Sequence, residues 1–160
     1  MKSPVFESCL QSTHSILIPN EIVTPFVIQK HRRIVVYIQF ESRSVQFHAA
    51  LQRRNELYFV MFSKKNQKQL DIFPSDYFKV QLLEDTSKYG VEMPEELEAV
   101  LQSDPEASEI FESFTDGMKR SLIYYVLGFK NSQTRIDKAL MITENIKLGI
   151  RDKKQILKKI

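Results

Sequence analysis

The spacing of apolar residues along the chain changes near position 90. Before it, apolar residues come in short bursts rich in β-branched and aromatic types, which is typical of β-strands. After it, they recur every three or four positions, which is typical of amphipathic helices. The change predicts an α+β protein with a small β-barrel domain over residues 1–89 and a helical subdomain over residues 90–160.

The first part contains five predicted strands and two predicted short helices. The run R-I-V-V-Y-I-Q-F is nearly continuous in apolar character, so we expect that strand to be buried on both faces. Asn20 is the predicted cap of a helix over 21–28, and Ser63 is the predicted cap of a helix over 64–70. The predicted strands cover residues 15–19, 33–40, 44–51, 56–62 and 77–83.

An internal repeat connects these elements. Residues 16–41 and 60–85 align without gaps at an offset of 44, and each half is predicted to be strand, short helix, strand. The eight shared apolar positions exceed the chance expectation of roughly six only slightly, so the shared order of elements is the better argument. Two such β-α-β halves could wrap into one small barrel. The shared apolar pairs are Ile16/Val60, Leu17/Met61, Ile18/Phe62, Phe26/Leu70, Ile28/Ile72, Ile34/Phe78, Val36/Val80 and Ile38/Leu82.

The second part contains four predicted helices. The first covers 94–102, and Asp104 followed by Pro105 is the predicted start of the second. Thr115 is the predicted cap of a third helix, which is apolar on most sides and therefore buried. Ser132 is the predicted cap of the last helix, and the basic tail 151–160 is expected to fray.

Composition places the chain among ordinary soluble globular proteins, with 42% apolar and 27% charged residues. No apolar run approaches the ~20 residues that span a bilayer. Glu7 and the polar run 11–14 interrupt any signal-peptide core, and Cys9 has no second cysteine with which to form an internal disulfide. We therefore expect a cytoplasmic protein without a membrane partner.

The charge is distributed unevenly. Residues 90–116 hold nine acidic residues and no Lys or Arg, whereas residues 117–160 carry a net charge of +8. Two antiparallel helical faces of opposite sign that attract each other would explain this layout. An acidic or basic binding surface is the alternative interpretation.

The helical part resembles the YdeI/OmpD-associated family, also called bacteriocin-protection proteins. The resemblance rests on the segments V-E-M-P-E-E-L (91–97), D-P-E-A (104–107), Phe111, K-R (119–120) and K-N-S-Q-T-R (130–135). The first half resembles the small β-domain of unknown function that commonly precedes this family's helices. The combination is similar to double-split β-barrel proteins, whose barrel consists of two β-α-β halves.

The resemblance implies a cytoplasmic bacterial protein that is a non-enzymatic binding or stress- and bacteriocin-protection module. We expect no cofactor, and we expect the partner to be an unknown protein or an anionic ligand. The chain departs from the family pattern at Gln133, where the family has Glu, and at Lys138-Ala139, where the family has a second Arg. Gln133 could not carry out proton chemistry if the Glu of the family did so.

The segment K-N-S-Q-T-R could also form a small anion site. Ser132 at a helix start would leave backbone N–H groups near the positive end of the helix dipole. Lys130, Thr134 and Arg135 would add donors for a phosphate or carboxylate. The alternative is that Ser132 only caps the helix while Arg135 pairs with an acidic residue of segment 90–116.

Basic pairs next to the predicted strands allow a nucleic-acid-binding interpretation. It requires the basic residues to converge on one face, and the net charge of +4 over residues 1–89 does not favour it. A solvated rim of the barrel explains the same residues. The candidate residues are Arg32, Arg33, Arg53, Arg54, Lys64 and Lys65.

Signatures of catalysis are mostly absent. There is no G-x-S-x-G or H-E-x-x-H motif, and the four glycines do not cluster into a nucleotide loop. The three histidines stand apart in the sequence, which favours separate roles over a shared metal site. A third hypothesis is a small-ligand or enzymatic pocket between the barrel and the helices, around Tyr124, Tyr125 and Arg135.

Overall fold

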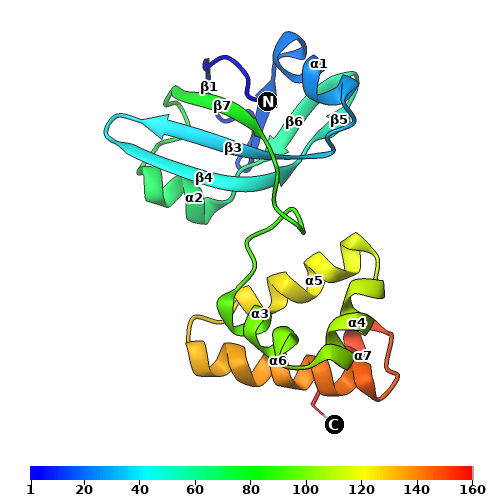
Figure 1. Ribbon diagram of the computed structural model, residues 1–160. Coiled ribbons are helices and arrows are strands. Elements are labelled where there is room, and N and C mark those ends of the chain that lie inside the picture. Colours follow the sequence, from blue (N-terminus) through cyan, green and yellow to red (C-terminus); the bar gives the residue numbers. More distant parts are fainter. Residues whose placement is uncertain (160) are drawn as a thin grey trace. The chain divides into compact units, whose positions relative to one another are not determined.

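The chain forms two compact units in a computed structural model, which describes residues 1–159. The first unit comprises residues 1–86 and the second residues 87–160, whereas the sequence pattern places the boundary between residues 89 and 90. The described residues form seven helices and two antiparallel sheets (Figure 1). The predicted α+β class is therefore confirmed.

The first unit contains a four-stranded sheet and a three-stranded sheet. The order in the larger sheet is β1-β7-β3-β4, with β1 (Phe6–Ser8), β7 (Phe78–Glu84), β3 (Arg33–Phe40) and β4 (Arg43–Ala50). The order in the smaller sheet is β2-β6-β5, with β2 (Ser15–Ile18), β6 (Leu57–Met61) and β5 (Gln52–Arg54). The strand pairing among residues 1–159 does not close into one barrel, so the double-split barrel stays a prediction.

The register of the strands follows the internal repeat. Ile16 of β2 lies directly opposite Val60 of β6, and these two residues are equivalent at the offset of 44. In the larger sheet, Val36 lies opposite Leu82 and Ile38 opposite Val80. At the offset of 44, Val36 is equivalent to Val80 and Leu82 is equivalent to Ile38, so these two pairs are equivalent to each other. The two strand–helix–strand segments therefore pair with each other symmetrically.

Apolar side chains from both sheets and both helices of this unit form one core. Phe62 stacks on Phe47 with ring centroids 5.6 Å apart and meets Phe78 edge-on at 5.7 Å. Burial of these rings and of the β-branched residues around them is the main stabilising contribution. The largest fully buried side chains are those of Ile16, Phe26, Ile34, Ile38, Phe62, Leu70 and Leu82.

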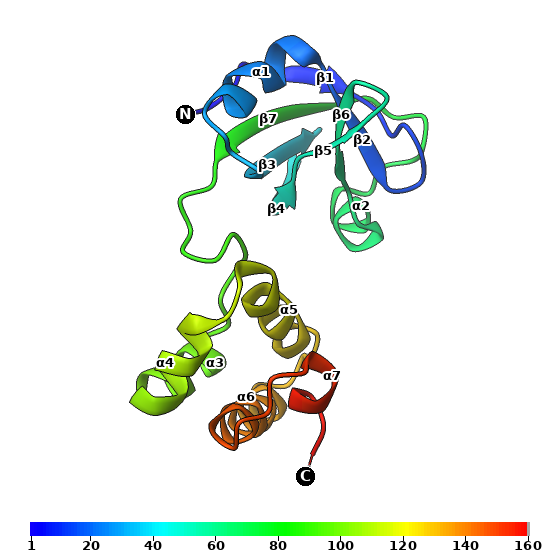
Figure 2. The ribbon, with the colours of Figure 1, turned by 90° about the vertical axis from the view of Figure 1, so that its right-hand side faces the viewer.

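Two helices connect the strands of the first unit (Figure 2). Helix α2 (Lys64–Leu70) begins as predicted, because the hydroxyl oxygen of Ser63 accepts a hydrogen bond from the backbone N–H of Asn66 at 3.2 Å. Helix α1 (Asn20–Ile28) differs from the prediction: Pro19 is its N-cap and no side chain caps it. Asn20 is therefore the first residue of α1, and its side chain does not cap this helix.

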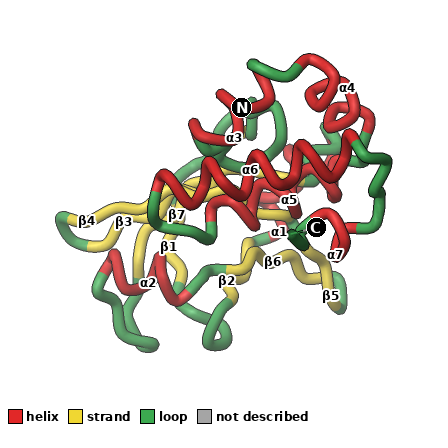
Figure 3. Tube along the Cα trace, turned by 90° about the horizontal axis from the view of Figure 1, so that it is seen from below, coloured by secondary structure: helices red, strands yellow, loops and turns green. Residues whose placement is uncertain are grey.

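The second unit is helical and packs around α6 (Ser132–Lys147), which contacts four other helices (Figure 3). These are α3 (Glu95–Gln102), α4 (Pro105–Ser113), α5 (Asp116–Leu127) and α7 (Lys153–Ile156). The predicted caps Asp104 and Thr115 are confirmed, since each side chain accepts a backbone N–H from its own first turn. The core contains Leu97, Ala107, Phe111, Leu122, Ile123, Val126, Ala139, Ile142, Ile146 and Ile156.

Residues 152–158 of the tail make ordered contacts that its charge did not lead us to expect. Asp152 caps α7 by accepting the N–H of Gln155 at 3.2 Å, and Ile156 is fully buried. The buried amide of Asn145 donates to the carbonyl oxygens of Ile156 and Lys158, at 2.7 and 2.8 Å. These contacts hold the tail against α6.

Across the described residues, none of the helices has the length and apolar character required to cross a membrane.

Candidate functional site

The segment 130–135 connects α5 to α6, and its cap is not the predicted one. Asn131 is the N-cap of α6: its Oδ1 atom accepts the backbone N–H of Thr134 at 3.1 Å. Ser132 is the first helical residue and is exposed, so the prediction that Ser132 caps this helix is wrong. Asn and Ser are about equally favourable at the N-cap position, so residue type alone could not show which of the neighbours Asn131 and Ser132 caps the helix.

Arg135 uses its guanidinium group inside the helical unit. Its Nε atom donates to the carbonyl oxygen of Phe129 at 2.6 Å, and its Nη2 atom donates to that of Leu127 at 3.2 Å. Its Nη1 atom lies 3.5 Å from Oε1 of Glu96, whose side chain is only 12% exposed. Arg135 therefore satisfies carbonyl groups left at the end of α5 and links α6 to α3.

This arrangement agrees with the interpretation in which Arg135 pairs with the acidic segment. Of the other candidates for the anion site, Lys130 and Ser132 are exposed and the N–H of Thr134 already donates to Asn131. Lys130 and Ser132 remain accessible to a solute, whereas Arg135 has internal partners. The anion site stays a prediction.

A second ion pair connects the acidic and basic segments. Nζ of Lys147 at the end of α6 lies 2.7 Å from Oδ2 of Asp104, which also caps α4. The hydrogen bond from Lys147, and then the one from the N–H of Ala107, lowers the pKa of Asp104 below its usual value. The pair Arg135–Glu96 joins the first turn of α6 to the first turn of α3, and the pair Lys147–Asp104 joins the last turn of α6 to the residue that caps α4. The acidic and basic segments therefore meet through these two ion pairs, whereas an antiparallel arrangement of their helical faces stays a prediction.

The sequence did not reveal a cluster around Tyr89. The hydroxyl group of Tyr89 donates to Oε1 of Glu112, and Nζ of Lys119 lies 3.5 Å from the other carboxylate oxygen. Nζ of Lys88 lies 3.2 Å from Oε1 of Glu112. Arg120 adds a 3.4 Å hydrogen bond to the carbonyl oxygen of Tyr89. The cluster thus attaches residues 88–89 to α4 and α5.

Burial and hydrogen bonding shift the pKa values in this cluster. Burial, followed by the hydrogen bond to Glu112, raises the pKa of the Tyr89 phenol above its usual value. Burial alone would raise the pKa of Glu112, but the hydrogen bonds from Tyr89 and Lys88 outweigh it and lower that pKa. The K-R pair at 119–120 was the only sequence signal for this site, and nothing in it indicated Tyr89.

The basic residues of the first unit lie in more than one place. Arg53 and Arg54 are neighbours in β5, so their side chains lie on opposite faces of the sheet. Arg54 lies opposite Leu57, the first residue of β6, whereas Lys64 and Lys65 follow the far end of that strand. Arg32 and Arg33 lie at the start of β3, where the carbonyl of Arg32 accepts the N–H of Leu51 at 2.9 Å.

These positions give no single cluster of the six candidate residues. The two ends of β6 alone are about 13 Å apart at the usual rise of a strand. The nucleic-acid hypothesis required Arg53, Arg54, Lys64 and Lys65 to lie on one face, and Arg53 and Arg54 do not share one. Nucleic-acid binding stays an alternative that this placement does not favour.

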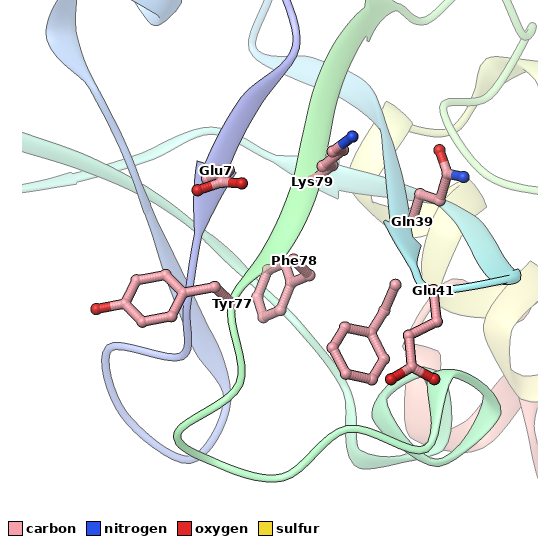
Figure 4. Close-up of a pocket in the computed structure, with 7 residues that line it drawn as sticks. Glu7, Gln39, Glu41, Tyr77, Phe78 and Lys79 are labelled. Atoms are coloured by element: carbon pink, nitrogen blue, oxygen red, sulfur yellow. The ribbon is translucent and has the colours of Figure 1, made fainter.

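A cavity of about 290 Å³ opens at one end of the four-stranded sheet (Figure 4). Figure 4 shows Glu7 and Glu41 on opposite sides of Phe78. Carboxylates beside aromatic rings suit a cationic ligand. However, Lys79 adds a positive charge to the lining, and Oε2 of Glu41 already lies 3.5 Å from Nη2 of Arg43. The lining residues are Glu7, Gln39, Phe40, Glu41, Tyr77, Phe78 and Lys79.

The histidines have separate partners. Nδ1 of His48 lies 2.7 Å from Oδ2 of Asp85, and Nε2 of His31 lies 3.7 Å from Oε1 of Glu84. Nδ1 of His14 lies 2.7 Å from the hydroxyl oxygen of Thr13. Throughout residues 1–159, no group of three or more His, Cys, Asp or Glu side chains is placed to hold a metal ion.

Comparison with known proteins finds a family similarity in the helical unit. Residues 90–149 match the model of the family described as bacteriocin-protection, YdeI or OmpD-associated. The helical unit is therefore similar to this family over those residues.

No curated protein matches the chain. A solution structure of PHS018 from Pyrococcus horikoshii is similar, with 19% sequence identity and a TM-score of 0.42. The match covers 50% of this chain and 88% of that one.

In the helical unit, the residues that carry this resemblance are parts of the packing. Pro94 is the N-cap of α3, while Leu97, Ala107 and Phe111 are fully buried. Arg135 and Asp104 make the internal bonds described above. The departure at Gln133 lies on the surface, where its side-chain amide donates to Oδ1 of Asp137 at 3.1 Å. Most of the residues that carry the resemblance thus maintain the helical arrangement.

Proposed function

We propose that the protein is a non-enzymatic binding module with a protective role of the kind for which the bacteriocin-protection family is named. The observation that carries this proposal is the match of residues 90–149 to that family. The proposal places the protein in the bacterial cytoplasm, where its partner is another protein or an anionic ligand.

The placement of the motif side chains supports the non-enzymatic part of the proposal. A general acid, base or nucleophile must reach the substrate through a polar atom. Asp104 is committed to a cap and to Lys147, and the three guanidinium nitrogens of Arg135 have protein acceptors. What these residues preserve is the shape and charge of the helical surface, which suits recognition.

The test is protection of living cells. The full chain is expressed in a bacteriocin-sensitive bacterium, which is then exposed to graded doses of the purified bacteriocin. We expect survival to rise in proportion to the amount of protein, because a binding module acts stoichiometrically. The bacteriocin recovered from these cells should have an unchanged mass, since no covalent step is involved.

The control is the Phe111→Ala variant at a matched expression level, because Phe111 is fully buried in the helical unit. Survival equal to that of cells with the empty vector, at a measured level of soluble protein, would contradict the protective role. A bacteriocin of altered mass would instead contradict the non-enzymatic role.

A further inference from the structure

The three-stranded sheet of the first unit presents an apolar outer face. Side chains alternate along β6, so Tyr58 and Val60 point to the core while Leu57, Phe59 and Met61 point outward. Val60 is fully buried, whereas Leu57 and Met61 are 50% and 49% exposed. The alternation therefore places three large apolar side chains of one short strand on the solvent side.

The neighbouring strand extends this face. Leu17 of β2 lies opposite Phe59, and side chains of directly opposed residues lie on the same face of a sheet. Leu17 and Phe59 are half-buried and do not belong to the core of the unit. We call Leu17, Leu57, Phe59 and Met61 the outer stripe. Figure 3 shows the strands β2, β6 and β5 that carry it side by side.

Both ends of the outer stripe are basic. Arg54 lies opposite Leu57, and its guanidinium carbon lies 5.5 Å from the centroid of the Phe59 ring. Beyond Met61, the exposed residues Lys64 and Lys65 begin α2. Glu56, in the turn between β5 and β6, adds one carboxylate at the Arg54 end. An apolar surface with positive ends is complementary to an apolar segment that carries negative charge.

We propose that the outer stripe binds an acidic amphipathic segment of a partner protein. The inference rests on the proposed function as a binding module and names the surface and the class of partner. Apolar side chains of the segment cover Leu57 and Met61, and its carboxylates meet Arg54 at one end and Lys64 and Lys65 at the other. An exposed apolar surface with a charged rim, which here is mainly basic, is typical of a protein-binding surface.

The stripe suits other occupants less well. A single-stranded nucleic acid binds by stacking bases on open aromatic rings, but Phe59 is the aromatic member of the stripe and Arg54 already lies over it. In a symmetric contact with a second copy, the same surface meets itself, so a second set of basic ends would be brought near the first. Aliphatic groups flanked by cations therefore favour an acidic protein segment.

The experiment is a selection from a phage-displayed library of random 16-residue peptides against the full chain. Enriched peptides are synthesised with fluorescein, and their binding is measured by anisotropy to three proteins. These are the wild type, a Leu57→Glu/Met61→Glu variant and a matched Phe73→Glu control. Phe73 is 69% exposed and lies outside the stripe. Circular dichroism verifies folding, and Leu57→Ala/Met61→Ala replaces the Glu variant if that variant is unfolded.

We expect the enriched peptides to be net negative with spaced apolar residues. Their binding should weaken roughly tenfold or more in the Leu57→Glu/Met61→Glu variant and stay unchanged in the control, since truncating a central apolar contact has an effect of this size. Binding should also weaken between about 50 and 200 mM salt, because salt screens exposed charges.

Several outcomes would overturn the proposal. No enrichment, enrichment of basic peptides, or equal binding to the variant would each do so. An oligothymidine that binds the wild type but not the variant would assign the stripe to nucleic acid instead. A dimer in sedimentation velocity that dissociates in the variant would assign it to a second copy. Loss of cell protection with intact peptide binding would contradict the proposed function alone.

Discussion

Nζ of Lys147 lies 2.7 Å from Oδ2 of Asp104, so the last turn of α6 is joined to the residue that caps α4. Two segments of opposite net charge therefore meet through a defined contact in addition to any general attraction. This contact has a measurable dependence on pH.

The first prediction concerns this pair. The folded state lowers the pKa of Asp104 below its ordinary value of 3.8, so the charged carboxylate stabilises the fold above that pH. This contribution is lost as pH falls through the lower pKa of the folded state. We expect the Asp104→Asn variant, which keeps a good cap, to melt at a lower temperature than the wild type at pH 7. The difference should vanish at the acidic end of a melting series followed by circular dichroism.

Lys147→Met and the double variant complete a cycle that isolates the pair. The pKa of Lys147 is raised above its ordinary value of 10.5, so its contribution is present below that pH and is lost as pH rises through the higher folded value. Additive effects of the two substitutions at pH 7 would show that no such coupling exists.

The second prediction concerns Arg135. Substitution by Ala removes hydrogen bonds to two carbonyl oxygens and leaves Glu96, whose side chain is 12% exposed, without this partner. Loss of hydrogen bonds from a charged group costs about 1.5–3 kcal/mol of unfolding free energy. Denaturation in urea, followed by helix content, measures this loss.

Arg135→Lys should recover little of this stability, because an ammonium group cannot reach three acceptors with the geometry of a guanidinium group. Lys130→Ala, at an exposed position of the same segment, is the matched control and should change stability by less than about 0.5 kcal/mol. If Arg135→Ala were as stable as this control, the internal contacts of Arg135 would make no measurable contribution to the free energy of unfolding.

The third prediction concerns Tyr89. The Tyr89→Phe substitution removes the hydroxyl group that donates to Glu112. Because that hydrogen bond is one cause that lowers the pKa of Glu112, the pKa should rise in the variant. Titration of the carboxyl carbon by NMR measures the change directly. Tyr77→Phe, at a side chain 68% exposed in the first unit, should leave the pKa of Glu112 unaltered.

The fourth prediction separates the contributions of two phenylalanines in the first unit. Phe62 is fully buried between Phe47 and Phe78, so Phe62→Ala should cost about 3–5 kcal/mol through lost burial and a residual cavity. Phe73 is 69% exposed, and Phe73→Ala should change stability by less than about 0.5 kcal/mol. Chemical denaturation of both variants tests this; equal losses would mean that the packing around Phe62 is not as described.

Periodicity predicted most of the fold, since long patterned segments determine which face of an element is buried. The predicted strand over 33–40 agrees with β3, and the predicted helix over 64–70 agrees with α2. The three-residue strands β1 and β5 were missed, because so short a segment has no measurable period. Helix α7 was missed for a different reason: its local sequence is basic, and the distant residue Asn145 holds it in place.

The candidate sites were harder to predict than the fold. Residue types near 130–135 indicated donors, but only the geometry showed that Arg135 turns towards Leu127 and Phe129. The hydrogen bond of Tyr89 joins residues 23 positions apart, and no local pattern encodes such a contact. The outer stripe was not recognised because its apolar residues resemble those of any buried strand.

The symmetric register of the first unit bears on how this architecture could have arisen. Ile16 and Val60 face each other as equivalent residues, and the pair Val36–Leu82 exchanges with Ile38–Val80 under the same offset. Two copies of one strand–helix–strand peptide could therefore make both pairings without any further segment. Duplication and fusion of the gene segment that encodes such a peptide would convert the homodimer into a single chain with two equivalent halves. A synthetic chain that contains either half twice would reproduce this fused ancestor.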